Sequence, residues 1–334
     1  MNHRVLVVMG VLAAGIVVGT LAATANAQTA TSSSWSAPRT PWGNPDLQGM
    51  WTNATATPLE RPTELEGKQV LTDEELAERD RRVAQENSTD NAPAAGNPGS
   101  HNEFWRERGR LGKRTSLLVD RPDGKLPPLT PEGQQAQTQL AEARKTSPAD
   151  GPESRNLFER CITRGLPGAM MGNFYNHNYH ILQAPGYVVI SVEMIHDARI
   201  IPLDGRPHVG QQIRQWLGDS RGRWEGNTLI VETTNFNNIS DRTISRALGV
   251  TVFGTSATAR VIERFTRLDA DTIDYQVTVD DPATYTQPWT AAIPMTKLQG
   301  TLFEFACHEG NSGMVGILEG HRAEEKAAEA AKRK

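Results

Sequence analysis

The chain has little of several features that mark particular classes of protein. Its 334 residues include only two cysteines, which excludes a small domain held together by many disulfides. Its formal net charge is -4, so the basic excess typical of nucleic-acid-binding proteins is missing. No segment after residue 27 approaches the roughly 18 continuous apolar residues that indicate a transmembrane helix. We therefore expect a globular mature chain with no membrane span and no nucleic-acid partner.

The sequence also lacks the short motifs of several common enzyme classes. It contains no phosphate-binding loop and no dinucleotide-binding fingerprint. Ser220 stands between Asp219 and Arg221, and residues 218–222 match the letters Gly-x-Ser-x-Gly, but they fall in a region of expected β structure and not in the strand–turn–helix context of α/β hydrolases. The His-x-His, His-x-x-x-His and paired-cysteine spacings that indicate metal sites are missing too; His177 and His180 lie three apart but would face opposite sides of a strand, and we expect them at the surface or in a loop. We expect no cofactor, and a divalent metal held by His196 and His308 stays as the alternative.

The N-terminal region has the pattern of an export signal. Arg4 precedes an apolar stretch from Val5 to about Ala23, and Ala25-Asn26-Ala27 forms a small-residue cleavage site. An uncleaved membrane anchor is the alternative, because the apolar stretch nearly reaches the length that spans a bilayer. Residues 1–27 are therefore predicted to be a cleaved signal peptide, which sends the protein to the periplasm or outside the cell.

The two cysteines, Cys161 and Cys307, allow one pairing. An exported protein meets an oxidising compartment, so we expect a disulfide between them. The alternative is a catalytic or metal-binding Cys307, because His308 and Glu309 follow it directly.

The composition changes along the mature chain and suggests its organisation. We expect an extended arm over 28–45, a first barrel strand over 46–56, a polar and partly helical insertion over 57–160, β structure over 161–318 and a helical tail over 319–334. Within the insertion, Thr72 and Glu75 form a capping-box pattern that predicts a helix to about Glu86. A second polar helix is expected near Glu132–Arg144.

Residues 161–318 show the alternation of β-branched and turn residues that is typical of antiparallel sheets. Four hairpins are predicted, with turns at Pro185-Gly186, Gly226-Asn227, Asp269–Asp271 and Gln299-Gly300; the last would join Trp289–Thr296 to Leu302–Cys307. The fold class is therefore all-β. A closed antiparallel barrel removes unpaired edges and is preferred, with a two-sheet sandwich as the alternative.

Two resemblances add to this interpretation. Gly49-Met50-Trp51 on a first strand, followed by a meander of hairpins, is similar to the lipocalin-like (calycin) barrels, which implies a pocket for a small molecule. Several further stretches resemble a group of exported bacterial proteins of unknown activity, which implies export: Pro38–Gly43, Pro45–Gly49, Arg114–Leu117, Glu193–Arg199, Trp216–Ser220 and Ala306–Asn311.

The densest polar cluster follows a very apolar strand and contains Glu193, His196, Asp197 and Arg199. The period of two places Val188, Ile190, Val192, Met194 and His196 on one face, so His196 would lie at the mouth of a barrel. A histidine beside a carboxylate suits general acid–base catalysis, with Asp197 orienting the ring and Arg199 stabilising an anion. The alternative is a structural network that closes a turn.

A second polar group, His308 and Glu309, ends the last expected strand. Strand ends gather at barrel rims, so His308 would meet His196 and supply a second acid–base or water-positioning pair. Glu263 shares a face with Val261 and Phe265, where a carboxylate is costly unless it is paired. A structural ion pair, with the neighbourhood of Arg264 or with an inward arginine, is the preferred explanation, and a base with a raised pKa is the alternative.

Aromatic residues make up only 6% of the chain, yet several fall on or near the expected strands. The candidates for lining a ligand pocket are Trp51, Trp216, Trp224, Trp289 and Tyr179. The alternative is that they fill the core and the rim.

Two functions are compatible with these residues, and the charged side chains at two strand ends favour the first. The first is an exported, cofactor-free enzyme that acts by acid–base chemistry (hydrolysis, elimination or isomerisation) on a small apolar or aromatic molecule. The second is a carrier of such a molecule without catalysis. A pocket that holds His196 and His308 together would favour the enzyme, whereas histidines in solvent and charges in ion pairs would favour the carrier.

Overall fold

The computed structural model describes residues 35–86, 109, 111–146, 149–172, 175–237 and 255–333. The chain separates into the units Met1–Trp35 and Ser36–Lys334, and all elements below belong to the second. The predicted signal peptide lies outside the described residues. No described helix is long and apolar enough to cross a membrane.

The described elements are ten strands, three α-helices and four short 3-10 turns. In chain order they are β1 (Gly49–Thr52), η1 (Thr63–Leu65), α1 (Asp73–Glu86), α2 (Pro131–Thr146), η3 (Pro152–Ser154), η4 (Gly168–Met170), β2 (Asn178–Ala184), β3 (Tyr187–Val192), η5 (Met194–His196), β4 (Ala198–Pro202), β5 (Asp219–Glu225), β6 (Thr228–Thr234), β7 (Arg260–Arg267), β8 (Thr272–Asp280), β9 (Trp289–Ala292), β10 (Met295–Lys297) and α3 (Ser312–Lys332).

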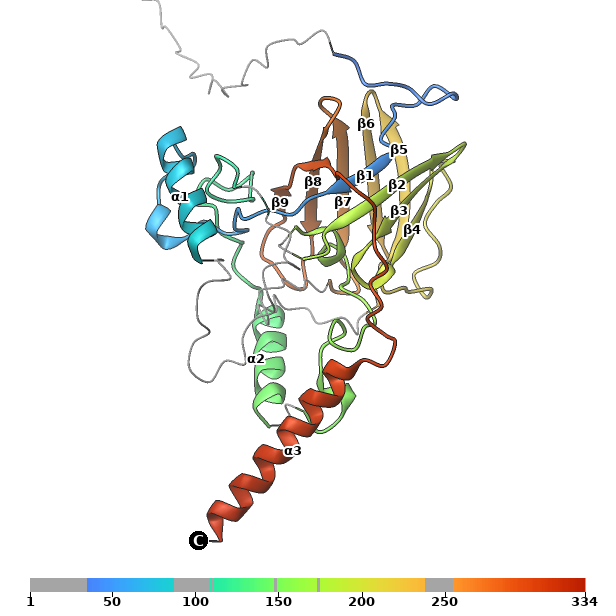
Figure 1. Ribbon diagram of the computed structural model, residues 1–334. Helices are drawn as coiled ribbons and strands as arrows, with labels where there is room; N and C mark the ends of the chain where they lie inside the picture. Colours follow the sequence, from blue (N-terminus) through green and yellow to red (C-terminus); the bar gives the residue numbers. More distant parts are fainter. Residues whose placement is uncertain are drawn as a thin grey trace, which may run out of the picture. The chain divides into compact units, whose positions relative to one another are not determined.

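The strands form one antiparallel sheet that curves into a nearly closed barrel (Figure 1). The order is β4-β3-β2-β1-β10-β8-β7-β6-β5, and β9 pairs with β8 off this path. The all-β prediction and the barrel are therefore confirmed, and the sandwich alternative is not found. The barrel interior carries the core: on β8, Ile273, Tyr275, Val277 and Val279 are buried and alternate with more exposed residues.

The two ends of the strand path, β4 and β5, meet without a hydrogen-bonded ladder among the described residues. Nine strands lie on the path and each runs antiparallel to its neighbour, so β4 and β5 run in the same direction. Side chains fill this seam: a Cβ added to Gly222 on β5 would lie 2.8 Å from Ile201 Cγ2 of β4. Arg199 and Ser220 also hydrogen-bond across it.

Three of the predicted hairpins are confirmed. The pairs β2–β3, β5–β6 and β7–β8 have the expected turns. The fourth is wrong. Residues 289–297 divide into β9 and β10 on either side of Ile293 and Pro294, and the expected partner strand is missing. Residues 301–307, which we call the strap, form no strand (Figure 1). β10 pairs with β1 and β8 instead.

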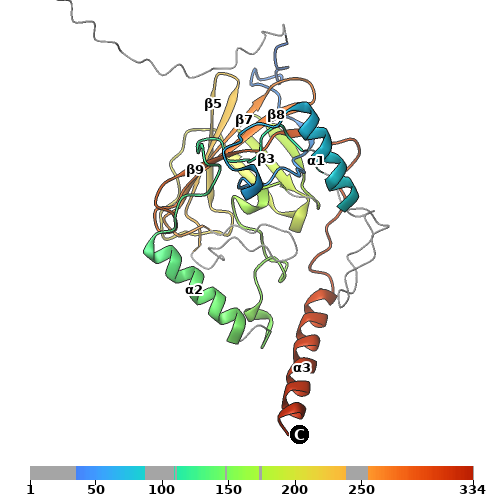
Figure 2. The ribbon, with the colours of Figure 1, turned by 90° about the vertical axis from the view of Figure 1, so that its left-hand side faces the viewer.

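The helices follow their predicted caps. Thr72 Oγ1 accepts a hydrogen bond from the Glu75 amide at 3.2 Å, and Glu75 Oε2 accepts one from the Thr72 amide at 2.9 Å, which is the predicted capping box. The helices α1, α2 and α3 are drawn outside the sheet in Figure 2. The C-terminal helix begins at Ser312 and not at the predicted residue 319, because the side chain of Asn311 caps it.

The structure adds a turn to the segment predicted to be an extended arm, and core contacts to the segment predicted to be a polar insertion. Residues 39–45 of the arm form a tight turn, in which the Thr40 amide donates to the Asn44 carbonyl at 2.8 Å. The insertion contributes Leu117 and Leu118 to the core, and the Val119 amide donates to the Thr290 carbonyl at 2.9 Å. The insertion is thus attached to β9 by backbone hydrogen bonds.

Candidate functional site

The turn between β3 and β4 changes the expected position of His196. Val188, Ile190 and Val192 are buried on the inward face as predicted, but the strand ends at Val192. The backbone then adopts positive φ at Ile195 (61°) and His196 (46°), and the Val192 amide donates to the Asp197 carbonyl at 2.8 Å. The extrapolated period of two is therefore wrong at His196, whose side chain is exposed.

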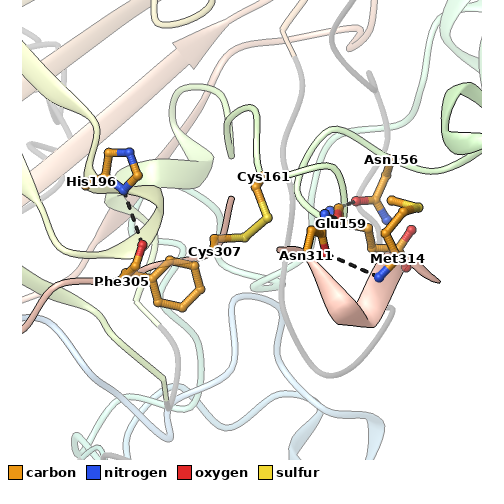
Figure 3. Close-up of a disulfide and its surroundings, with 8 residues drawn as sticks. All are labelled: Asn156, Glu159, Cys161, His196, Phe305, Cys307, Asn311 and Met314. Carbon is orange, nitrogen blue, oxygen red and sulfur yellow. Dashed lines mark hydrogen bonds between the residues drawn. A yellow bond between two sulfur atoms is a disulfide. The ribbon is translucent and has the colours of Figure 1, made fainter. Parts of the chain in front are cut away.

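His196 and Asp197 form a small polar group at this turn. His196 Nδ1 lies 3.2 Å from the Phe305 carbonyl oxygen of the strap, as Figure 3 shows. A carbonyl only accepts, so Nδ1 carries the proton and Nε2 of the neutral ring is the basic nitrogen. Burial raises the pKa of Asp197 to about 6, although a hydrogen bond from Thr163 and the nearby His196 act in the opposite direction.

Glu193 is buried beside this turn, where two donors occupy its carboxylate. Asn178 Nδ2 donates to Oε2 at 2.6 Å, and the Phe303 amide donates to Oε1 at 3.0 Å. These contacts tie the strap to the start of β2. Glu193 therefore holds the strap in place.

Arg199 points into the barrel and away from the turn. It is 3% exposed, and its two terminal nitrogens donate to both oxygens of Glu263, with Nη1 2.8 Å from Oε1. Burial acts to lower the pKa of Arg199, but the attraction and hydrogen bonds of Glu263 outweigh it and raise the pKa. The preferred pairing of Glu263 with an inward arginine is confirmed.

Further polar groups complete this interior network. Tyr275 Oη donates to Glu263 Oε1 at 3.0 Å, and Arg199 Nη2 lies 3.4 Å from Ser220 Oγ, which hydrogen-bonds Thr233 Oγ1 at 2.8 Å. Burial, followed by the Glu263 charge, raises the pKa of Tyr275 well above its usual value, so the phenol stays protonated. We call Arg199, Glu263, Tyr275, Ser220 and Thr233 the interior network. The Arg199 Nε is buried and has no hydrogen-bond acceptor among the described residues.

The aromatic candidates divide between the core and the surface. Trp51, Tyr179 and Trp289 are fully buried, whereas Trp224 is partly buried and Trp216 is 37% exposed. Trp51 pairs with Tyr179 on neighbouring strands, and the centroids of the Phe265 and Tyr275 rings lie 4.8 Å apart. The inward face of the barrel around the interior network therefore combines aromatic rings with a larger number of aliphatic side chains.

The second predicted polar group follows a disulfide. The predicted disulfide between Cys161 and Cys307 is confirmed, with Cα atoms 5.6 Å apart (Figure 3). His308 and Glu309 follow it and are exposed. Among the described residues no hydrogen bond connects His308 with His196.

Sequence reasoning missed two other buried polar residues. His177 was expected at the surface but is 1% exposed, because it packs beside the equally buried Arg164, whose Nη1 lies 3.4 Å from the ring nitrogens. Burial, with help from the Arg164 charge, lowers the pKa of His177 well below its usual value. Burial also lowers the pKa of Arg164 to about 10. The polarity of both residues concealed their burial.

Two further features lie away from the predicted site. A pocket of about 500 Å³ lies between η1 and α1 and is lined mainly by charged side chains with Leu65 and Leu71. Among the described residues, the one group of three side chains suited to a metal is Asp150, His321 and Glu325. His196 and His308 are not part of such a group.

Comparisons with protein-family models, curated proteins and solved structures find no match. The resemblance to calycin barrels is therefore supported by architecture alone, since the chain forms an antiparallel barrel that is nearly closed.

Proposed function

We propose that this protein is an exported carrier that binds a small, neutral, largely aromatic molecule inside the barrel, next to the interior network. The observation that carries the proposal is the buried Arg199–Glu263 pair with the unmatched Arg199 Nε. A buried ion pair is weak evidence for stability, because taking both charges out of water is costly. A polar group among aromatic side chains is, in contrast, the usual composition of a ligand pocket.

The charge of the network indicates the chemistry of the ligand. Glu263 already neutralises Arg199, so an anionic ligand would find no free positive charge and would itself be an uncompensated buried charge. A neutral acceptor, such as a ketone or ester oxygen, would accept from the Nε without adding charge. The aromatic side chains Phe265 and Tyr275 would contact the apolar part of the molecule.

The architecture also supports a site for one molecule. A barrel of about eight strands has an interior that holds side chains or one small ligand, and the diameter grows with strand number. Nine strands lie on the path of this barrel. The seam between β4 and β5 has no ladder to break, so it is the proposed entrance once the side chains that fill it move aside.

The test uses prodan, a neutral aromatic ketone whose emission responds to hydrogen bonding. We expect one binding site per chain for prodan and much weaker binding of the anionic 8-anilinonaphthalene-1-sulfonate. The matched variant is Arg199→Met with Glu263→Leu, which removes both charges and keeps the interior filled. Loss of prodan binding in this folded double variant supports the carrier. Equal prodan binding by the double variant, or preference for the anionic dye, would contradict it.

A second candidate function is acid–base catalysis at His196 and Asp197. It is favoured by the two successive residues with positive φ, since strained backbone clusters at functional sites, and by the raised pKa of Asp197. A periplasmic organic extract would be incubated with the protein and analysed by mass spectrometry. Consumption of a component by the native chain but not by His196→Ala, with an unchanged melting temperature, supports catalysis. No consumption, or equal consumption by the variant, would exclude it.

A further inference from the structure

Three potential metal ligands from distant parts of the chain meet outside the barrel. Asp150 follows α2, while His321 and Glu325 lie one helical turn apart on α3 and therefore share a face. The ligand atoms of Asp150, His321 and Glu325 all lie within 4.8 Å of one another. We call these residues the Asp150 triad.

The fold brings these residues together through a series of contacts between the same two segments. The disulfide joins Cys307 to Cys161, and Asn311 Nδ2 then donates to the Glu159 carbonyl at 3.1 Å (Figure 3). The C-terminal segment thus runs antiparallel to residues 150–161. Continued in this direction, α3 reaches Asp150. Ala149, the residue before it, is 3% exposed, so the loop at this point is packed.

The charges around the triad are unbalanced in favour of a cation. His321 Nε2 lies 3.4 Å from Glu325 Oε1, and Nδ1 lies 3.9 Å from a Glu324 oxygen. Among the described residues, no lysine or arginine forms an ion pair with Asp150 or Glu325. Two carboxylates and an imidazole therefore converge, and neither carboxylate is paired with a lysine or arginine among the described residues.

We propose that the Asp150 triad binds one Zn²⁺ ion and fastens α3 to the loop after α2. One imidazole nitrogen and two carboxylate oxygens are a known type of zinc ligand set, and water would complete four-fold coordination. The imidazole favours zinc over Mg²⁺ and Ca²⁺, which prefer oxygen ligands. This site is separate from the proposed barrel site, so each proposal is tested without the other.

The experiment is a Zn²⁺ titration of the untagged chain, stripped with a chelator, in competition with a chromogenic chelator. We expect one ion per chain and no competition by Mg²⁺. Each of His321→Ala, Asp150→Asn and Glu325→Gln should weaken zinc binding by at least about tenfold. Glu319→Gln on the same helix and His308→Ala on the surface are matched controls and should leave the affinity unchanged. Circular dichroism checks that every variant is folded.

A second measurement separates a built site from zinc held loosely at the surface. Zinc should slow proteolysis within α3 of the native chain and have no such effect in Asp150→Asn. Zinc affinity that is insensitive to the three triad substitutions, or lost equally in the two controls, would overturn the proposal. Zinc binding without protection of α3 would show an adventitious ion only and would overturn it as well.

Discussion

Asp197 and Arg199 are two residues apart in the sequence and lie in opposite electrostatic situations. Arg199 is buried in the barrel against Glu263, and its pKa is raised because the carboxylate outweighs the effect of burial. Asp197 lies at the rim, where burial dominates and raises its pKa to about 6. A buried group with a matched counter-charge stays ionised, whereas one without it moves toward its neutral form. The interior thus suits a permanent polar anchor, and the rim suits proton exchange.

The turn that carries His196 and Asp197 contacts the strap, and the disulfide anchors the strap. Of the substitutions considered, removal of the disulfide should therefore lower the free energy of unfolding the most. The bridge spans 146 residues, and the double variant Cys161→Ser with Cys307→Ser should lower the free energy of unfolding by about 5 kcal/mol in the chain-entropy model. Urea unfolding followed by circular dichroism measures this change. A loss below about 1 kcal/mol would show that the other contacts of the strap hold it without the bridge.

Breaking the Arg199–Glu263 pair should have the next largest effect on the free energy of unfolding. Arg199→Ala or Glu263→Ala alone should cost about 3 to 5 kcal/mol, because either change leaves an uncompensated buried charge. The apolar double variant Arg199→Met with Glu263→Leu should be close to neutral for the same reason. Urea unfolding of the three variants forms the test. If the double variant lost as much unfolding free energy as the two single variants together, the two charges would act independently. That result would contradict the contrast between a matched interior pair and an unmatched rim carboxylate.

The rim is tested by the pH dependence of stability. The pKa of Asp197 is higher in the folded chain than its usual value of 3.8, so the folded state binds the proton more tightly. The contribution is favourable below pH 4 and is lost as the pH rises to about 6. Asp197→Asn should therefore match the native chain near pH 4 and exceed its unfolding free energy at pH 7 by on the order of 2 kcal/mol, after allowance for solvent screening. A pH-independent difference would contradict this cause.

The sequence predicted local features better than long-range ones. The turns at Gly186 and Gly226 and the capping box at Thr72 were identified because their signals lie within a few residues. The fourth hairpin failed because residues 301–307 are held in the strap by Glu193 and the disulfide and do not pair as a strand. No local pattern encodes these contacts, which join residues more than 100 positions apart.

In the candidate site, too, the features that depend on local patterns were predicted and those that depend on distant residues were not. Alternation placed Val188 and Ile190 inside the barrel, and the cost of burying Glu263 indicated an inward arginine. The partner, Arg199, was instead assigned to the rim with His196, because a period of two was extended through a turn with positive φ. The hydrogen bond of Tyr275 to Glu263 depends on the register of β7 and β8, which no local pattern specifies.

Native mass spectrometry of the purified chain mixed with prodan tests the central claim most directly. The native chain should carry one prodan molecule, and the apolar double variant at Arg199 and Glu263, folded and of similar stability, should appear without it. A native chain that appears only at its own mass under the same conditions, or a double variant that carries prodan equally well, would contradict a binding site at the interior network.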